Sequence, residues 1–144
     1  MNSIVKIGWI IASAILIISG VMHVHGIFLS NDLDPDDALL LELMKSSSIL
    51  MDKTGTMWNL WIGFHAMFGV CLIFIGSMVL YLSTKYFLTL CKQHFILLLT
   101  IFTVGFFVWV GYKYLITAFV VSMGVPLLLY IIGYVMVLLR PNNS

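Results

Sequence analysis

Four long apolar stretches determine what this chain of 144 residues can fold into. They cover residues 4–29, 57–83, 95–112 and 115–139. A helix that crosses the hydrocarbon core of a bilayer needs about 20 predominantly apolar residues, and each stretch is close to or above that length. Hydrophobic residues make up 62% of the chain and charged residues only 9%, so it is far more apolar than a soluble domain. The sequence therefore predicts an integral membrane protein with four spans.

The four stretches are predicted to be helices that pack in one bundle. Backbone polar groups cannot stay unpaired in lipid, so a span is either a helix or a strand of a closed barrel. Barrel strands alternate apolar and polar residues, and these stretches do not. We therefore expect an all-α integral membrane protein in which residues 1–144 form a single four-helix domain. No small-residue cleavage site follows the first apolar run, so we expect an uncleaved signal anchor.

In size and layout the chain resembles the small four-helix proteins of the bacterial inner membrane, the DoxX-like group among them. The likeness covers the whole chain in its pattern of spans and involves no diagnostic motif. It implies a compact bundle in a bacterial inner membrane, and it assigns no residue.

Charged residues are distributed unevenly between the two sides of the predicted spans. All six acidic residues lie in the 30–56 loop: Asp32, Asp34, Asp36, Asp37, Glu42 and Asp52. Lysine and arginine in short loops favour the cytoplasmic side of a membrane. One side carries four such residues, Lys6, Lys85, Lys92 and Arg140, and the other carries three, Lys45, Lys53 and Lys113. We therefore expect both termini in the cytoplasm and the 30–56 loop outside.

The outer loop is predicted to contain a short amphipathic helix. Asp34 is a suitable N-cap residue, and Pro35 after it is favoured at the first helical position. Asp36 and Asp37 would then lie in the first turn, where carboxylates favour the positive end of the helix dipole. Apolar residues follow at helical spacing: Leu39, Leu40, Leu43 and Met44. We expect a helix from residue 35 to about 45, on the outer membrane surface or folded over the mouth of the bundle.

Two histidines lie inside the first two spans, on helical faces that are expected to meet. His23 shares a face with Gly20, and His65 shares a face with Gly69. Small residues allow membrane helices to approach closely, so both imidazoles are expected to point into the bundle. His25 is rotated by about 200° from His23 and is expected to point elsewhere. The sequence therefore predicts that His23 meets His65 across the first and second spans.

Aromatic and polar residues near the outer ends of the spans are predicted to form a pocket in the outer leaflet around this pair. The fourth span leaves the outer side near Pro126, and a proline inside a helix is expected to kink it. Tryptophan and tyrosine at span ends are also typical of aromatic belts at membrane interfaces, and this alternative interpretation applies to Trp9 among others. The candidate ligand-binding residues are His23, His65, Trp58, Trp61, Trp109, Tyr112 and Ser122.

No motif in the sequence identifies a catalytic reaction. The chain has no P-loop, dinucleotide-binding glycine turn, serine nucleophile elbow or Cys-x-x-Cys pair. Histidines within a bundle serve as structural hydrogen-bond partners, as contacts to a ligand, or as ligands to haem or a metal. No thiolate or carboxylate lies at the level of His23 and His65 unless the acidic loop folds in. We therefore assign no metal ligand, and the cofactor is left open.

The favoured interpretation is a small polytopic membrane protein that binds an apolar ligand, such as a quinone, a lipid or an isoprenoid, in this outer-leaflet pocket. A second interpretation is a non-catalytic accessory subunit of a larger membrane complex. A third and weaker one is a haem- or metal-dependent membrane enzyme. The expected partners are membrane lipid, an apolar small molecule, and other membrane subunits or further copies of the chain; nucleic acid is not among them.

Overall fold

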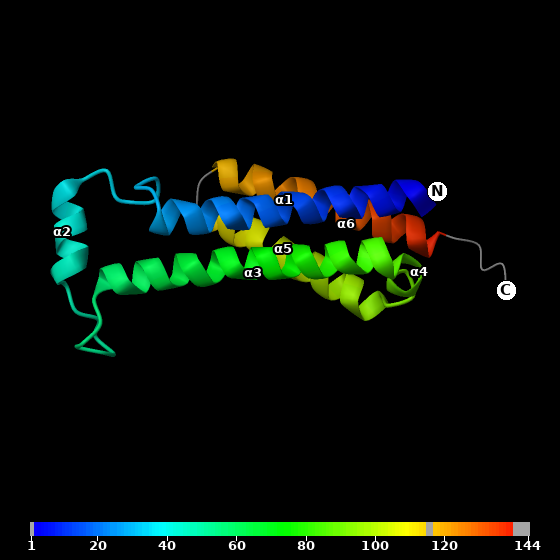
Figure 1. Cartoon of the computed structure of the whole chain (residues 1–144). Helices are drawn as coiled ribbons and strands as arrows, with labels where there is room; N and C mark the ends of the chain where they lie inside the picture. The colour runs from blue at the N-terminus through cyan, green and yellow to red at the C-terminus, as the bar shows by residue number, and fades with distance from the viewer. Residues whose placement is uncertain (1, 115–116, 140–144) are drawn as a thin grey trace. The chain divides into compact units, whose positions relative to one another are not determined.

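The computed structural model describes residues 2–114 and 117–139, and these residues form six helices. In chain order they are α1 (Asn2–Phe28), α2 (Ala38–Ser46), α3 (Met57–Lys85), α4 (Phe87–Leu90), α5 (His94–Tyr114) and α6 (Thr117–Leu138) (Figure 1). Four of them, α1, α3, α5 and α6, are long and apolar enough to cross a membrane. They coincide with the predicted spans, and the prediction of an all-α membrane bundle is confirmed. Residues 115–116 of the fourth predicted span lie outside the described residues, as does Arg140.

The chain divides into two compact units. Unit 1 comprises Met1–Ile18 and Phe74–Ser144, and unit 2 comprises Ser19–Ile73. Helices α1 and α3 therefore each contribute one part to unit 1 and the other part to unit 2. Unit 1 also contains α4, α5 and α6, whereas unit 2 contains α2 and the acidic loop. The prediction of one four-helix domain over residues 1–144 stays a prediction.

The core of unit 1 is organised around Trp9 of α1. Its side chain is completely buried and lies 5.8 Å, between ring centroids, from Phe87 of α4. Gly133 of α6 makes room for the indole, because a Cβ at that position would collide with the Trp9 ring. The expectation that Trp9 belongs to an interfacial aromatic belt is therefore wrong. A glycine on a neighbouring helix, more than 100 residues away in the sequence, accommodates the ring inside the unit.

A polar contact joins α1 to α6 within the same core. The hydroxyl of Ser13 donates to the Trp9 carbonyl at 2.7 Å and lies 2.9 Å from the hydroxyl of Tyr130. Both residues are buried, and the contact satisfies polar groups that would otherwise be costly to remove from water. Pro126 lies inside α6, as predicted, and is also buried. The kink that was expected at Pro126 stays a prediction.

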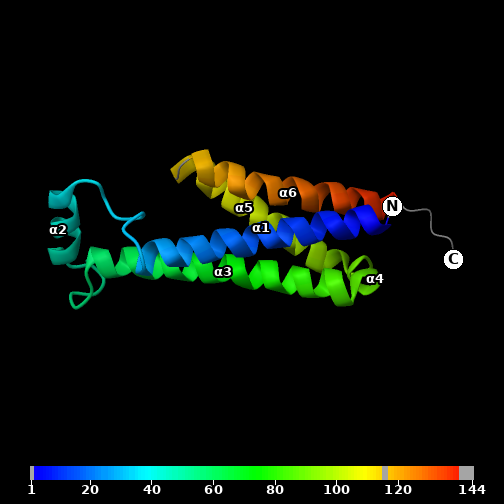
Figure 2. The same cartoon turned by 45° about the horizontal axis from the view of Figure 1, so that its top comes forward.

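In unit 2, α1 and α3 approach each other at glycines (Figure 2). A Cβ built at Gly20 would lie 2.6 Å from the carbonyl oxygen of Gly69, and one at Gly69 would lie 2.7 Å from Cγ2 of Val24. Gly20 lies against Ile73, and Val24, further along α1, lies against Gly69, which comes earlier in α3. The two helices therefore run antiparallel. The predicted small-residue contact between the first two spans is confirmed. Close approach of this kind is how membrane helices gain packing contacts without a hydrophobic driving force.

Helix α2 forms in the 30–56 loop, but it begins later than predicted. Its N-cap is Asp37, whose carboxylate accepts hydrogen bonds from the backbone amides two and three residues further on, at 2.8 and 3.4 Å. Asp34 instead closes a turn, because its amide donates to the carbonyl of Asn31 at 3.1 Å. The predicted start at Pro35 and cap at Asp34 are therefore wrong. A start at Ala38 leaves aspartates, which are poor helix formers, outside the helix.

Helix α2 lies across the ends of α1 and α3 in unit 2 (Figures 1 and 2). None of its side chains is buried, and Leu39 and Leu43 are 63% and 51% exposed. The ammonium of Lys45 lies 5.3 Å from the centre of the Trp58 ring at the start of α3, which is within the range of a cation–π contact. The leucine side chains of α2 therefore make little contact with the rest of the described residues and can contact another molecule.

The loop of residues 47–56 connects α2 to α3 and contains a turn in which the amide of Gly55 donates to the carbonyl of Asp52. Ser48 and Thr56 form an isolated antiparallel bridge, and Leu50 and Met51 between them are 87% and 97% exposed. Inside the turn, the hydroxyl and the amide of Thr54 donate to the Asp52 carboxylate at 2.7 and 2.9 Å. These hydrogen bonds lower the pKa of Asp52 below its ordinary value because they stabilise the carboxylate, and the bond from the Thr54 hydroxyl has the larger effect.

Candidate functional site

The candidate site is built on a direct contact between His23 of α1 and His65 of α3, both in unit 2. Nε2 of His23 lies 2.8 Å from Nδ1 of His65, a hydrogen-bond distance. The ring centroids are 4.9 Å apart, and the ring planes make an angle of 29°. The predicted meeting of these two residues is confirmed. At about 1.5 Å of rise per residue, His23 lies about 8 Å from the end of α1 and His65 about 12 Å from the start of α3.

Aromatic rings flank the histidine pair on both sides. The Trp61 ring lies 4.2 Å from the His65 ring, and the Phe68 ring lies 5.1 Å from the His23 ring, edge to face. The indole N–H of Trp61 donates to the carbonyl of Leu33 at 3.2 Å, which attaches the start of α3 to the segment before α2. Both histidine rings are only half-buried. The pair is therefore a polar group in apolar surroundings that an outside molecule can still reach.

His25 behaves differently from His23, as predicted. Its side chain is exposed, whereas the ring of His23 contacts both His65 and Phe68. Two residues along a helix correspond to a rotation of about 200°, which turns His25 away from α3. The tripeptide from His23 to His25 is thus not a chelating pair, and only one of its imidazoles belongs to the site.

The contact between the two imidazoles determines what the pair offers to a ligand. Each neutral imidazole has one N–H and one lone pair, and the contact uses one N–H from one ring and one lone pair from the other. If His23 donates, the N–H of His65 lies on Nε2 and the free lone pair of His23 lies on Nδ1. If His65 donates, these two assignments are exchanged. In both cases the neutral pair keeps one donor and one acceptor on the nitrogens that do not face each other.

The other four candidate residues differ in their surroundings. Trp58 is in unit 2, where it lies under the ammonium of Lys45. The remaining three, Trp109, Tyr112 and Ser122, belong to unit 1. There, Trp109 packs 5.6 Å from Phe106, Tyr112 is exposed, and the hydroxyl of Ser122 donates to the carbonyl of Phe119 at 2.9 Å. A single pocket formed by all seven candidates stays a prediction.

The geometry of the pair bears on metal binding. Among residues 2–114 and 117–139, no group of three or more His, Cys, Asp and Glu side chains is arranged to hold a metal ion. Metal–nitrogen bonds of about 2 Å require about 4 Å between two nitrogens on opposite sides of an ion. The facing nitrogens of His23 and His65 are 2.8 Å apart. Axial ligation of a haem iron from opposite faces would therefore require the rings to separate.

Two members of the site were not among the sequence-based candidates. Phe68 lies three residues after His65, so helical spacing places it on a neighbouring position of the same face, and that signal was present in the sequence. The carbonyl of Leu33, which holds the Trp61 indole, is a backbone group in an irregular segment. No residue pattern identifies such an acceptor.

The chain was also compared with known proteins. No protein-family model, no curated protein and no solved structure matches it.

Proposed function

We propose that this chain is a small membrane protein that binds an apolar ligand with a carbonyl or hydroxyl head group at the His23–His65 pair. A quinone and an isoprenoid alcohol are ligands of this kind. The observation that carries the proposal is the half-buried imidazole pair, held at 2.8 Å between aromatic rings. Ionisable groups inside membrane spans are costly and mark functional sites by default.

The chemistry of the pair fits such a head group. The free N–H of one imidazole is a donor for a quinone carbonyl, and the free lone pair of the other accepts from a hydroxyl. The neighbouring rings of Trp61 and Phe68 offer apolar and aromatic surface to the rest of the ligand. Binding sites for small apolar molecules have this composition, with few polar groups among aromatic side chains.

The proposed orientation places the site in the outer leaflet, with both termini in the cytoplasm. It follows from the side of Lys6, Lys85 and Lys92 relative to the spans, because basic residues favour the cytoplasmic side. Cysteines introduced in the 84–93 link are then protected from an impermeant thiol reagent in intact cells, and a cysteine at Ser47 is labelled. The reverse labelling pattern would place the site in the inner leaflet.

The binding test uses the purified protein in lipid nanodiscs and a short-chain ubiquinone analogue as the probe. The variants His23→Leu and His65→Leu each remove one half of the pair, and each is expected to weaken binding about tenfold, the cost of one polar contact left unpaired at a site shielded from water. His25→Leu is the matched control, because it makes the same change at an exposed position on the same helix. It is expected to bind the probe like the unmodified chain.

Folding and binding are separated by melting curves of the same samples. A variant that melts with the unmodified chain but no longer binds the probe supports the proposal. Equal binding by all three variants would refute it, as would equal losses from His23→Leu and His25→Leu. An absorption spectrum of the unmodified protein completes the test, since a Soret band would instead indicate haem.

A second function is favoured by a different observation, the exposed apolar residues of the outer loop. We propose as the alternative that the chain is an accessory subunit whose outer loop contacts a larger membrane complex. Leu43, Leu50 and Met51 all lie outside the membrane-spanning helices and are strongly exposed. Exposed apolar side chains that gather in one segment are typical of interaction sites.

The alternative is tested by photo-crosslinking in intact cells. A photoreactive side chain at Leu43 or Met51 is expected to give one discrete polypeptide adduct, and the same group at the exposed Thr84, at the opposite end of α3, is not. Adducts with lipid alone from Leu43 and Met51 would contradict the accessory function and leave ligand binding as the proposed function.

A further inference from the structure

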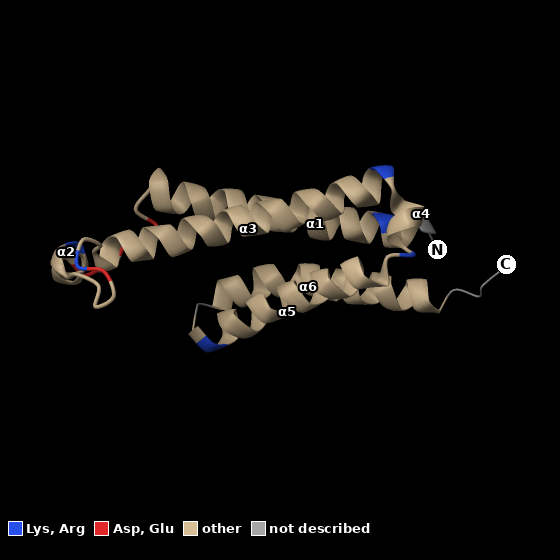
Figure 3. Cartoon of the chain, turned by 90° about the horizontal axis from the view of Figure 1, so that it is seen from below, with Lys and Arg blue, Asp and Glu red and all other residues tan. Residues whose placement is uncertain are grey.

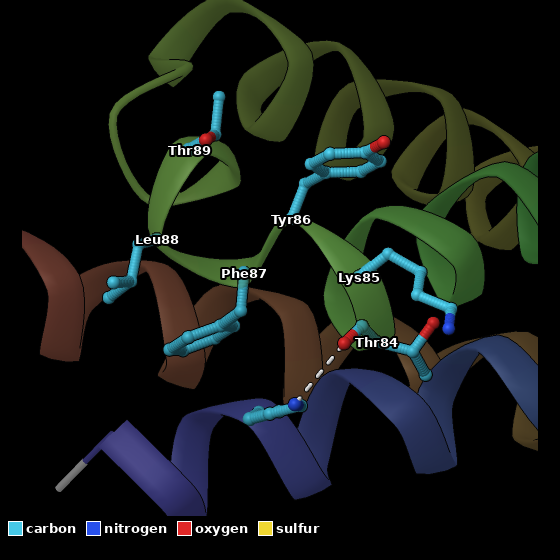
Figure 4. A pocket seen from close by; sticks show the side chains of 7 residues that line it. Thr84, Lys85, Tyr86, Phe87, Leu88 and Thr89 are labelled. Carbon is cyan, nitrogen blue, oxygen red and sulfur yellow. Dashed lines mark hydrogen bonds between the residues drawn. The ribbon is translucent and has the colours of Figure 1, made fainter.

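A cavity of about 340 Å³ that is open to the surface lies in unit 1, at the corner where α3 ends and α4 begins. It is lined by Lys6 of α1 and by residues 84–89 (Figure 4). The ammonium of Lys6 donates to the carbonyl of Thr84 at 3.3 Å, shown as a dashed line in Figure 4. The Lys85 side chain on the same corner is exposed. Two lysines therefore line one cavity, and the ammonium of Lys6 is held there by its bond to Thr84.

The chain offers no acidic side chain to balance these lysines. All six acidic residues lie between positions 32 and 52, so none belongs to unit 1. In Figure 3, lysine segments lie near α4 with no Asp or Glu segment beside them, and one further lysine segment lies at the end of α5. The carbonyls at the end of α3 carry a partial negative charge of about half a unit. That charge is smaller than the charge of two ammonium groups, so a net positive potential remains.

The lining of the cavity is amphiphilic, which distinguishes a lipid from a small soluble anion. Leu88 is exposed and Phe87 is buried, and both line the cavity together with the lysines. Tyr86 and Thr89 also line the cavity. Helix α3 ends at Lys85, where a membrane-spanning helix reaches the level of lipid headgroups.

We propose that this corner is a binding site for the phosphate of an anionic phospholipid headgroup. Lys6 and Lys85 contact the phosphate, and Leu88 contacts the upper part of an acyl chain. Basic pockets at the ends of membrane helices attract anionic headgroups in this way. The site shares no residue with the histidine pair and does not depend on the function proposed for that pair.

The experiment is native mass spectrometry of the whole chain with added phosphatidylglycerol, phosphatidylcholine or inorganic phosphate. The unmodified chain is expected to retain phosphatidylglycerol at least tenfold better than phosphatidylcholine. The double variant K6Q/K85Q is expected to lose this preference, because each lysine near a headgroup contributes several-fold to affinity. The preference is also expected to weaken at high salt.

Three controls make the result decisive. K92Q/K113Q removes the same net charge outside the cavity and is expected to keep the preference. K6R/K85R keeps the charge and is expected to keep it as well. K85Q alone leaves the Lys6 bond to Thr84 in place and is expected to lose several-fold, so a folding defect of the double variant does not decide the test.

Equal retention of phosphatidylglycerol by K6Q/K85Q and the unmodified chain would overturn the proposal. Equal losses from K92Q/K113Q would also overturn it, because they would indicate a general effect of net charge. Binding of inorganic phosphate that competes fully with phosphatidylglycerol would assign the corner to a free anion and refute the lipid site.

Discussion

The two units of this chain are stabilised by different kinds of contact. Unit 1 has a core of fully buried side chains, among them Trp9, Leu16 and Met123, and no acidic residue. Unit 2 buries few side chains, carries all the acidic residues, and contains the imidazole pair of His23 and His65. The stability of unit 1 therefore depends mainly on close packing of buried side chains. The stability of unit 2 depends more on individual polar contacts.

The difference indicates which unit is more suited to ligand binding and which contributes more to the stability of the fold. A core of well-packed side chains tolerates little change in volume, whereas a sparsely packed region opens more readily and is where ligand-binding elements are usually found. The half-buried histidine pair lies in the sparsely packed unit. The comparison therefore predicts that substitutions which add volume affect unit 1 most, and that substitutions which remove a polar atom have local effects in unit 2.

The largest effect is expected from Gly133→Ala in unit 1. The added methyl would collide with the buried Trp9 ring, which has no free space to move into, so the free energy of unfolding should fall by about 1 to 3 kcal/mol, near the upper end. Thermal melting of the detergent-solubilised protein measures the change. Gly124→Ala on the same helix is the control, because nothing lies within 4 Å of a Cβ there, and it should melt like the unmodified chain.

A smaller loss is expected from Gly69→Ala in unit 2. The added methyl would lie 2.7 Å from Cγ2 of Val24 and 3.1 Å from the carbonyl oxygen of Gly20, so α1 and α3 must separate slightly. Because unit 2 is sparsely packed, we expect this shift to cost only about 1 kcal/mol in the same melting experiment. Gly63→Ala on the same helix has nothing within 4 Å and serves as the control. If Gly69→Ala cost more than Gly133→Ala, the distinction between the two units would not hold.

The third prediction concerns a single polar atom in unit 2, the capping carboxylate of α2. Asp37→Ala removes the acceptor of two backbone amides and should destabilise α2 locally by about 1 kcal/mol. Faster hydrogen exchange of the Leu39 and Leu40 amides measures it. Asp34→Ala should leave these amides unchanged, since Asp34 joins its turn through its backbone amide. If Asp34→Ala increased the exchange of these amides more than Asp37→Ala, Asp34 would be the cap.

The smallest effect is expected at the exposed turn before α3. Hydrogen bonds from Thr54 lower the pKa of Asp52 below its ordinary value of 3.8, so the ionised carboxylate stabilises the turn. This contribution is complete above pH 3.8 and is lost as the pH falls through the lowered pKa of the folded turn. An NMR titration of the Thr54 amide should have a midpoint below 3.8, and Thr54→Val should raise it. A midpoint at or above 3.8 would contradict the hydrogen-bonded turn.

The spans and the histidine contact were predictable because each depends on a regular helix. Length and apolar composition determine where α1 and α3 lie, and the rotation of about 100° per residue then determines the face of His23 and of His65. Glycines on the same faces, Gly20 and Gly69, made a close contact the expected outcome.

The burial of Trp9 and the start of α2 were not predictable in the same way. Trp9 is buried because Gly133 faces it from α6, and a contact between residues so distant in the sequence leaves no local pattern. At α2, Asp34 and Asp37 are both suitable caps, and the choice depends on the turn that uses the Asp34 amide. When two residues are equally suitable as the N-cap, the hydrogen bonds of the surrounding loop determine which of them begins the helix.

The concentration of acidic residues between α1 and α3 also has a consequence for insertion into the membrane. The 30–56 segment carries six carboxylates and two lysines, a net of four negative charges. In the proposed orientation this segment crosses the bilayer when the chain is inserted, toward the positive side of the membrane potential. Each elementary charge gains about 2.3 kcal/mol per 100 mV, so the potential assists the transfer by about 9 kcal/mol per 100 mV. The membrane potential therefore favours the same orientation of the chain as Lys6, Lys85 and Lys92 do.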